Sequence, residues 1–253
     1  MTRYLLCIEY DGTPFSGWQR QEAALTVQGA LEASATKLIG QEIQVFGAGR
    51  TDAGVHALGQ AAHLDICDDF PAHKLADALN AHLRPHPVSI LSAKAVGDSF
   101  HARFDAIKRY YHYRIMSRRA DLTLDKGLVW RVPYPLDVAA MRQGAAYFEG
   151  IHDFSTFRDT QCQARTPIRS LDPIQITRRG DMVDVFCSAK SFLHRQVRSI
   201  VGSLVEVGRG RQAPEWIGEI LGACARDRCG PVAPAHGLYL TKVIYPEPPE
   251  IRL

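Results

Sequence analysis

Residues 47–57 read Gly-Ala-Gly-Arg-Thr-Asp-Ala-Gly-Val-His-Ala, and the rest of the chain can be arranged around them. An alternating run from Glu42 to Phe46 precedes this stretch and another from Gln60 to Ile66 follows it, and both runs predict β-strands. The glycines permit positive φ angles and the close approach of other groups. The stretch therefore predicts a loop between two strands that presents one carboxylate, Asp52, two residues after Arg50.

Two interpretations of this loop fit its residues. In the first, which spacing alone favours, Arg50 and Asp52 form a solvated ion pair at a bend. In the second, the loop holds an ionised carboxylate against a substrate. A phosphate-binding role fits less well, because the loop lacks the Lys-Ser/Thr ending of a P-loop and does not open a helix as the dinucleotide fingerprint does. A hydrolase would need a second acid or a metal-binding carboxylate cluster, whereas Asp65, Asp68 and Asp69 fit a solvated strand end and turn.

The sequence on both sides extends the pattern of strands and helices through residue 96. Thr2 to Tyr10 predicts a strand, and a helix with Val27 and Leu31 on one face follows and stops at Gly40. After the two strands around the loop, Pro71 opens a second helix, and Pro87 to Val96 predicts a closing strand. The resulting order, β-α-β-β-α-β, is typical of a ferredoxin-like (split βαβ) unit.

A second series of strands and helices follows from Lys108. We expect strands at 108–115, 174–177, 182–189 and after 233, and helices at 138–148, 192–207 and from Pro214. Residues 151–169 read as one long irregular segment, a length that often indicates function. No low-complexity linker divides the chain. We therefore predict an α+β fold of two closely packed α/β domains, 1–104 and 105–253, with the basic second domain completing the site.

Composition indicates a packed globular protein, at 46% hydrophobic and 23% charged residues. No apolar run is long enough to cross a bilayer. The six cysteines form no CxxC pair and have no matched histidine spacing, so a disulfide framework or zinc site is not predicted. We expect a cytoplasmic, reduced protein. His56 and His63 also lack ligand spacing, and we expect them to be structural or hydrogen-bonding residues.

The charge distribution is uneven. Residues 1–99 carry 7 Lys and Arg against 11 Asp and Glu, whereas residues 100–253 carry 23 against 16. A basic second half is consistent with binding to a polyanion. Arginine outnumbers lysine 23 to 7, which suits phosphate and base recognition but is equally explained by a GC-rich genome.

The helix predicted at 192–207 contains an arginine in an unusual place. Leu193, Val197, Ile200 and Leu204 form its main apolar stripe, and Arg198 lies on the adjacent, mixed stripe. A half-buried arginine needs an anionic partner, because an unpaired buried charge is costly. The alternative is an aliphatic stem that packs flat with its charged head in water.

These stretches together resemble the tRNA pseudouridine synthase A family. The signature is Gly47 to His56, and six further stretches match in collinear order across nearly the whole chain. They are Glu9-Tyr10-Asp11-Gly12 with Gly17-Trp18-Gln19-Arg20-Gln21, Phe100-His101-Ala102-Arg103-Phe104, Tyr111-His112-Tyr113, Gln161-Cys162-Gln163-Ala164-Arg165-Thr166-Pro167, Phe192-Leu193 through Val197-Arg198 to Val201-Gly202, and Gly237-Leu238-Tyr239-Leu240.

The resemblance implies a pseudouridine synthase fold of two ferredoxin-like halves, with largely antiparallel sheets and a catalytic cleft between them. It implies isomerisation of uridine to pseudouridine at positions 38, 39 and 40 of the tRNA anticodon stem-loop. By the match, Asp52 is the catalytic carboxylate, Arg198 pairs with it, and Tyr111 lies against the target base. Whether Asp52 attacks the base, attacks C1′ or removes a sugar proton is left open by the residues. The family acts as a homodimer and implies neither cofactor nor metal.

The reaction also requires extrusion of the uridine from the stem, at a cost of a few kcal/mol. By resemblance, Arg50 fills the vacated space, and a loop that assists extrusion comprises Gln161, Cys162, Gln163, Ala164 and Arg165. An RNA-contacting segment comprises Phe100, His101, Ala102, Arg103 and Phe104, in which aromatic faces beside cations suit unstacked bases.

The chain departs from the family pattern in two places. Arg195 and Gln196 stand where His-Met is common, and Ala48 stands where cysteine is frequent; the first change puts RNA contacts there in doubt. The main alternative is a catalytically idle RNA-binding or RNA-folding protein on the same fold. The presence of Asp52 together with Arg50, Tyr111 and Arg198 favours an active enzyme.

Overall fold

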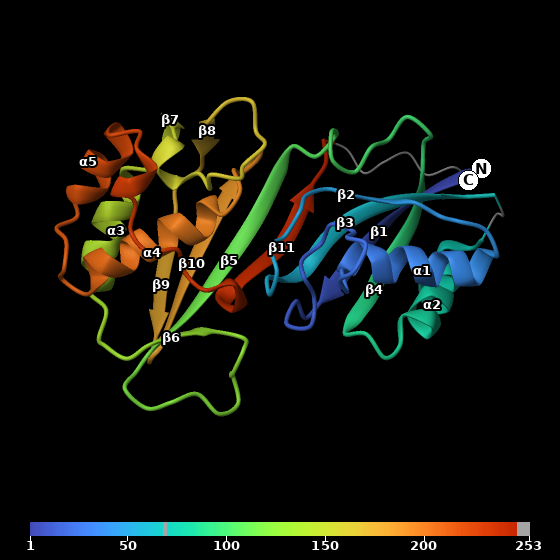
Figure 1. Cartoon of the computed structure of the whole chain (residues 1–253), viewed down its shortest axis with the longest axis horizontal. Helices are drawn as coiled ribbons and strands as arrows, with labels where there is room; N and C mark the ends of the chain where they lie inside the picture. Colours follow the sequence, from blue (N-terminus) through green and yellow to red (C-terminus); the bar gives the residue numbers. More distant parts are fainter. Residues whose placement is uncertain (68–69, 247–253) are drawn as a thin grey trace. The chain divides into compact units, whose positions relative to one another are not determined.

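All six elements predicted in the first hundred residues are present in the computed structural model, which describes residues 1–67 and 70–246 (Figure 1). They are β1 (Thr2–Tyr10), α1 (Val27–Ile39), β2 (Val45–Gly47), β3 (His56–Ile66), α2 (Ala72–Leu83) and β4 (Val88–Val96). The order β-α-β-β-α-β is confirmed. The strands around the signature loop differ from the prediction in length, because β2 is only three residues long and β3 begins at His56, four residues earlier than expected.

These strands form a mostly antiparallel arrangement. β1 pairs antiparallel with both β3 and β4, and β2 pairs antiparallel with β3. On the other side of β3, strand β11 (Leu238–Ile244) pairs parallel to it, with Tyr239 opposite His56. Helices α1 and α2 pack on each other and lie over one face of these strands (Figure 1). β3, which carries the end of the signature loop, is therefore a central and largely buried strand.

Helix α1 has the bounds that its local signals predict. The Thr26 side chain accepts a hydrogen bond from the Gly29 N–H, which satisfies one of the free donors at the helix start. Gly40 takes a left-handed conformation and its N–H bonds back to the Thr36 carbonyl. Glu32 is buried on this helix and accepts the Val45 N–H, so the helix also fixes the start of β2.

The second half of the chain forms a further set of paired strands with helices. The strands are β5 (Lys108–Ser117), β6 (Trp130–Val132), β7 (Gly150–Asp153), β8 (Ile168–Leu171), β9 (Gln175–Arg179) and β10 (Met182–Ala189). They are ordered β5-β10-β8-β7, with β6 beside β5 and β9 beside β10. The helices are α3 (Val138–Ala146), α4 (Gln196–Gly208) and α5 (Trp216–Gly222), and the single turns of 3₁₀ helix are η1 (Ser155–Phe157), η2 (Arg226–Arg228) and η3 (Ala235–Gly237). The predicted α+β class with largely antiparallel pairing is confirmed.

Two sequence predictions in this half are wrong in detail. Residues 151–169 are not wholly irregular, because β7 and β8 pair antiparallel with each other and η1 lies between them. The helix expected from Phe192 begins at Gln196, because Arg195 adopts a left-handed backbone conformation with φ of 59° that a right-handed helix cannot contain. Both differences arise from contacts distant in sequence.

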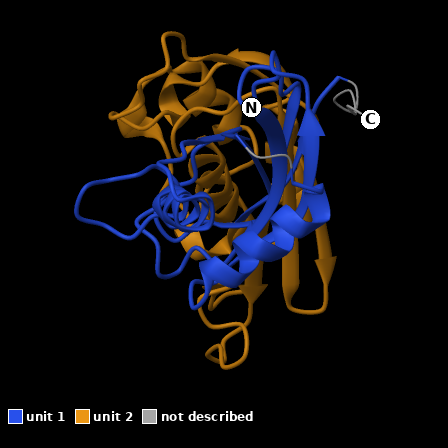
Figure 2. Ribbon diagram, turned by 90° about the vertical axis from the view of Figure 1, so that its right-hand side faces the viewer, with its two compact units in different colours: residues 1–109, 239–253 blue, residues 110–238 orange. Residues whose placement is uncertain are grey.

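The chain divides into two compact units (Figure 2). Unit 1 comprises residues 1–109 and 239–253, and unit 2 comprises residues 110–238. The domain boundary that the sequence predicts at residue 104 stays a prediction.

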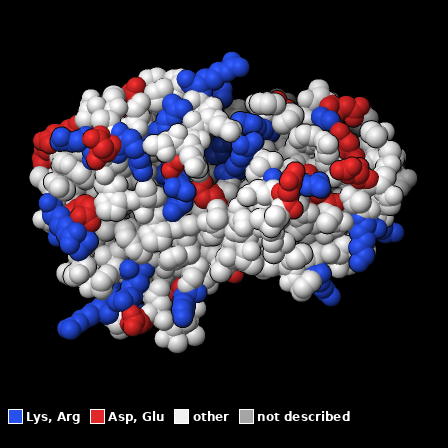
Figure 3. All heavy atoms as spheres, in the orientation of Figure 1, with Lys and Arg blue, Asp and Glu red and all other residues white. Residues whose placement is uncertain are grey.

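Unit 2 carries 18 Lys and Arg against 13 Asp and Glu, and unit 1 carries 12 against 14. Figure 3 shows one face, on which side chains of both signs are interspersed. Within residues 1–67 and 70–246, no helix has both the length and the apolar character needed to cross a membrane.

Candidate active site

Three contacts hold the part of the signature loop that precedes Asp52. The Ala48 N–H donates to the Ala61 carbonyl at 2.7 Å, and the Gln60 side chain donates to the Gly49 carbonyl at 3.0 Å. The buried Thr51 hydroxyl lies 2.8 Å from the Tyr10 hydroxyl. Asp52 itself is half-buried. The backbone just before this residue is therefore anchored to β1 and β3.

Arg50 is exposed at the surface of the same loop. After Asp52 the chain makes a tight turn in which the Val55 N–H donates to the Asp52 carbonyl at 3.1 Å. His56 then opens β3, buried, and its Nδ1 accepts the Gly12 N–H at 3.1 Å. The prediction that His56 is a hydrogen-bonding structural residue is confirmed. The turn and His56 fix the direction in which the backbone leaves Asp52.

The loop at residues 11–18 packs directly on the signature loop. The Trp18 N–H donates to the Thr51 carbonyl at 3.0 Å. A Cβ added at Gly12 would lie 2.0 Å from the Val55 carbonyl oxygen, and one added at Gly17 would lie 2.9 Å from that of Thr51. Because no side chain fits at these approaches, both positions need glycine. The first two stretches that carried the resemblance thus form one structural assembly around Asp52.

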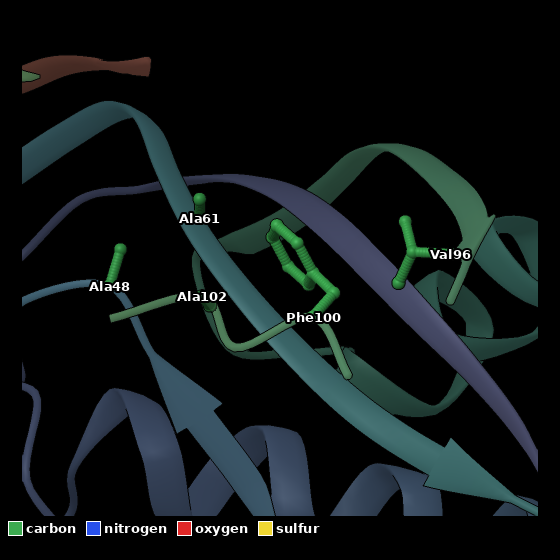
Figure 4. Packing of buried hydrophobic residues seen from close by; sticks show 5 residues of the cluster. All are labelled: Ala48, Ala61, Val96, Phe100 and Ala102. Carbon is green, nitrogen blue, oxygen red and sulfur yellow. The ribbon is translucent and has the colours of Figure 1, made fainter. Parts of the chain in front are cut away.

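The segment 100–104 divides between core and surface. Phe100 and Ala102 are buried in a cluster with Ala48, Ala61 and Val96 (Figure 4). Arg103 and Phe104 are exposed, with 71% of Phe104 accessible, and His101 is half-buried. The Phe104 ring lies 4.3 Å from that of His101, and the Arg103 guanidinium lies 5.7 Å from the Phe104 ring. The buried members hold the segment against the signature loop, and the other three present an aromatic and cationic surface.

A buried histidine supports this segment from beneath. His63 on β3 accepts the Ala102 N–H through Nδ1 at 3.1 Å, and its ring stacks on Phe46 with 5.0 Å between centroids. Burial, together with the charges of Arg3 and His101, lowers the pKa of His63 to about 4. The ring is therefore neutral near pH 7, as an accepting Nδ1 requires. The prediction that His63 is structural is confirmed.

Arg109 is a residue of this region that sequence reasoning missed. Its guanidinium donates to the carbonyls of Ala48 at 2.7 Å, Arg103 at 2.8 Å and Ala106 at 3.0 Å. It therefore ties the signature loop to the segment 100–104 within unit 1. In the sequence it is one of several cations in a basic strand, so nothing marked it out.

Unit 2 contains the remaining predicted residues. Tyr111 is half-buried on β5, and its ring meets Phe192 edge-to-face with centroids 5.1 Å apart. Arg198 is half-buried in the first turn of α4, as its stripe predicted. Its Nε donates to the Ala233 carbonyl at 2.8 Å, and the Ala233 N–H returns a bond to the Arg198 carbonyl at 3.1 Å. These bonds hold the stem of Arg198 in a defined position.

The segment 161–165 turns its longer polar side chains outward. Gln161, Gln163 and Arg165 are exposed, whereas Cys162 and Ala164 are partly covered. The Arg158 guanidinium holds two carbonyl groups of this segment together, because it donates to the Cys162 carbonyl at 2.7 Å and to the Ala164 carbonyl at 2.9 Å. Arg158 lies within residues 151–169, and nothing in the sequence distinguishes it from the other polar residues there.

The acidic residues considered for a metal cluster do not form one in the part of the chain that is described. Asp65 forms a bidentate ion pair with Arg3, in which both N–O distances are 2.7 Å. Asp68 and Asp69 lie outside the described residues. Within residues 1–67 and 70–246, no group of three or more His, Cys, Asp and Glu side chains is placed to hold a metal ion.

The sequence of this chain matches the tRNA pseudouridine synthase family over residues 6–105 and 145–246. It is 58% identical to tRNA pseudouridine synthase A of Maricaulis maris, covering 98% of this chain and 100% of that protein. The identity is 58% to the protein of that name from Rhodopseudomonas palustris strain BisB5, and 56% to that of Hyphomonas neptunium. These two alignments each cover 97% of this chain, and 100% and 99% of the two proteins respectively.

Among solved structures, a chain in the crystal structure of a Cbf5-Nop10-Gar1 complex is similar with a TM-score of 0.36 and 14% identity, covering 94% of this chain and 47% of that one. At those values the likeness is too weak to add to the sequence matches. On the sequence matches, the chain belongs to the tRNA pseudouridine synthase family. Tyr111 lies between the two matched stretches, and the other predicted site residues lie within them.

Proposed function

We propose that this protein isomerises uridine to pseudouridine at positions 38, 39 and 40 of the tRNA anticodon stem-loop, breaking the N-glycosidic bond and joining C5 to C1′. The activity on tRNA uridines follows from the family and from near full-length relatives named tRNA pseudouridine synthase A. The observation that carries the proposal is the half-buried carboxylate of Asp52 on a loop whose neighbouring residues are anchored on both sides. A reaction without an external cofactor needs such a positioned group.

Within this proposal, Asp52 is the catalytic carboxylate. Tyr111 and Arg198 bind the target nucleotide, and Arg198 serves as the cation that pairs with Asp52. The position of Arg198 is supported by its two bonds with Ala233. The pairing itself and the contact of Tyr111 with the base stay predictions.

The extruded uridine and its surroundings need further contacts. Arg50 fills the space that the extruded uridine leaves in the stem, because its side chain is exposed on the signature loop and can enter the RNA. The exposed Gln161, Gln163 and Arg165 assist extrusion. The protein acts as a homodimer in the cytoplasm, in keeping with what the family resemblance implied.

The proposal is tested by mapping pseudouridine in tRNA from cells with and without this protein. Loss confined to positions 38–40, restored by the purified enzyme acting on an unmodified transcript, is the expected result. Loss at another position would reassign the target. An unchanged modification map, with intact tRNA binding, would favour the idle RNA-binding protein on the same fold.

The division of segment 100–104 predicts opposite effects at its two phenylalanines. Phe104→Ala removes an exposed ring, so the stability of the fold should change by less than about 0.5 kcal/mol. Binding of an anticodon stem-loop should weaken about tenfold, because stacking on an aromatic ring contributes about 1–3 kcal/mol per base. Phe100→Ala should instead destabilise the fold by about 3–5 kcal/mol. Thermal melts and RNA titrations of both variants measure this, and unchanged RNA affinity in Phe104→Ala would remove Phe104 from the interface.

A further inference from the structure

Asp159 lies at the start of the segment assigned to uridine extrusion and is almost fully buried, with 7% of its surface accessible. Its Oδ1 accepts the Gln161 N–H at 2.9 Å, and its carbonyl accepts the Cys162 N–H at 3.0 Å. These bonds shape the first turn of the segment 161–165. A buried carboxylate requires positive or hydrogen-bonding partners to remain charged, and Asp159 has both.

Two side chains just before α4 lie against the carboxylate of Asp159. The Arg195 guanidinium lies 3.0 Å from Oδ2, and His194 Nδ1 lies 3.6 Å from Oδ1. The backbones are joined as well, because the Asp159 N–H donates to the His194 carbonyl at 3.1 Å. Burial alone would raise the pKa of Asp159, but the Gln161 N–H and the charges of Arg195, His194 and Arg226 lower it overall. The carboxylate is therefore ionised at neutral pH.

Arg195 occupies an unusual position in the backbone. Its φ of 59° is disfavoured for a residue with a side chain, by about 1–2 kcal/mol. Such a conformation persists where surrounding contacts determine it, and the ion pair with Asp159 is such a contact. The Arg195 carbonyl accepts the Ser199 N–H at 2.9 Å, so the same residue starts α4. Arg198 is one turn further along.

The ion pair therefore connects two elements that carry predicted site residues within unit 2. The carboxylate belongs to Asp159, which precedes segment 161–165. The guanidinium belongs to Arg195, which precedes α4 and its Arg198. Arg226 separately connects η1, which precedes Asp159, to α4, because it donates to the Thr156 carbonyl and to the Ser199 hydroxyl, each at 3.1 Å. Arg195 is also the residue that departs from the common family pattern, and Asp159 is the partner with which it pairs.

We propose that Asp159 is a positioning residue, whose ion pair with Arg195 fixes the segment 161–165 to the start of α4. The segment 161–165 and Arg198 then stay at a constant distance from each other while the target nucleotide is bound. This inference rests on the proposed function for its catalytic consequence, but the coupling of the two elements is a property of the free protein. The two parts can therefore be tested separately.

The catalytic test uses Asp159→Asn, Arg195→Gln and the double variant in single-turnover assays on an anticodon stem-loop transcript. Each single change should lower the rate between about tenfold and about a hundredfold, because small misplacements of binding groups have effects of that size. The dissociation constant for the RNA should stay within about threefold. The double variant should be no slower than either single variant, because both remove the same interaction. The matched control is Arg211→Gln, which removes the ion pair between Arg211, beyond the other end of α4, and Glu206 in the last turn of that helix. This variant should keep the wild-type rate.

The structural test measures amide hydrogen exchange in the same variants without RNA. Exchange at Gln161 and Cys162 should accelerate about tenfold in both single variants, while the buried α4 residue Leu204 keeps its protection. Acceleration at Leu204 to the same extent would indicate a general loss of stability and overturn the positioning role. Wild-type turnover in both single variants would also overturn it, as would losses of turnover that multiply in the double variant. If the wild-type protein forms no pseudouridine, the proposed function fails, while the exchange experiment still decides whether the ion pair fixes the segment 161–165 to α4.

Discussion

Asp52→Asn should abolish pseudouridine formation while tRNA binding is retained. Asparagine has nearly the same shape, so the bonds that anchor Ala48, Gly49 and Thr51 remain. It carries no charge and cannot act as nucleophile or base. Loss of a residue that performs the chemistry reduces turnover by about 10⁴-fold or more. Single-turnover assays with mass-spectrometric detection of pseudouridine, together with RNA titrations, measure the two quantities separately.

The matched control for this variant is Asp77→Asn. Asp77 is an exposed carboxylate on α2, and its replacement removes the same charge from unit 1 without touching the signature loop. It should retain the wild-type rate. If Asp52→Asn turned over within about tenfold of wild type, Asp52 would not be the catalytic group. A large loss of tRNA binding in that variant would give the carboxylate a binding role instead.

Gly12→Ala should destabilise the protein and reduce activity together. The added Cβ would lie 2.0 Å from the Val55 carbonyl oxygen, and backbone rather than a flexible side chain would have to move. The movement also disturbs the bond from the Gly12 N–H to His56. Overpacking of this severity costs about 3 kcal/mol, which lowers the melting temperature by about 6–12 °C in a chain of this size. Thermal melts followed by circular dichroism and the turnover assay measure both effects.

Gly97→Ala provides the comparison for Gly12→Ala. Gly97 follows β4, and a Cβ added there meets no atom within 4 Å. Its melting temperature and activity should equal those of wild type. A Gly12→Ala protein with unchanged melting temperature and rate would mean that the loop at 11–18 does not need to approach the signature loop so closely.

Elements with complete local signals were predicted from the sequence with their correct bounds. Helix α1 is an example, because its apolar stripe and Gly40 define it without reference to the rest of the chain. Strand β10 is another, since its alternation from Met182 to Ala189 corresponds to one buried face. The signature loop was placed between two strands for the same reason. Its chemistry, however, came from resemblance and not from its own spacing, which favoured a solvated ion pair.

Features that depend on distant contacts were not predictable. The late start of α4 requires the left-handed Arg195, and its partner Asp159 is 36 positions earlier in the chain. The pairing of β7 with β8 involves outward residues such as Ile151 and Ile168, which are 74% and 46% exposed and give no burial signal. Arg109 and Arg158 support the candidate site through carbonyl groups, and any residue can supply a carbonyl. No side-chain pattern therefore identifies these contacts.

The parallel strand β11 has a consequence for synthesis of the chain. Tyr239 pairs with His56 and stacks on its ring with centroids 4.7 Å apart, although 183 positions separate the two residues. The ribosome therefore releases the loop that carries Asp52 long before it releases the strand that completes the neighbouring edge of β3. Contacts between such distant segments form slowly, and unpaired strand edges are prone to aggregation until they close. A nascent chain stalled before residue 238 would hold the signature loop beside an open β3 edge, so this edge of β3 is completed only late in translation.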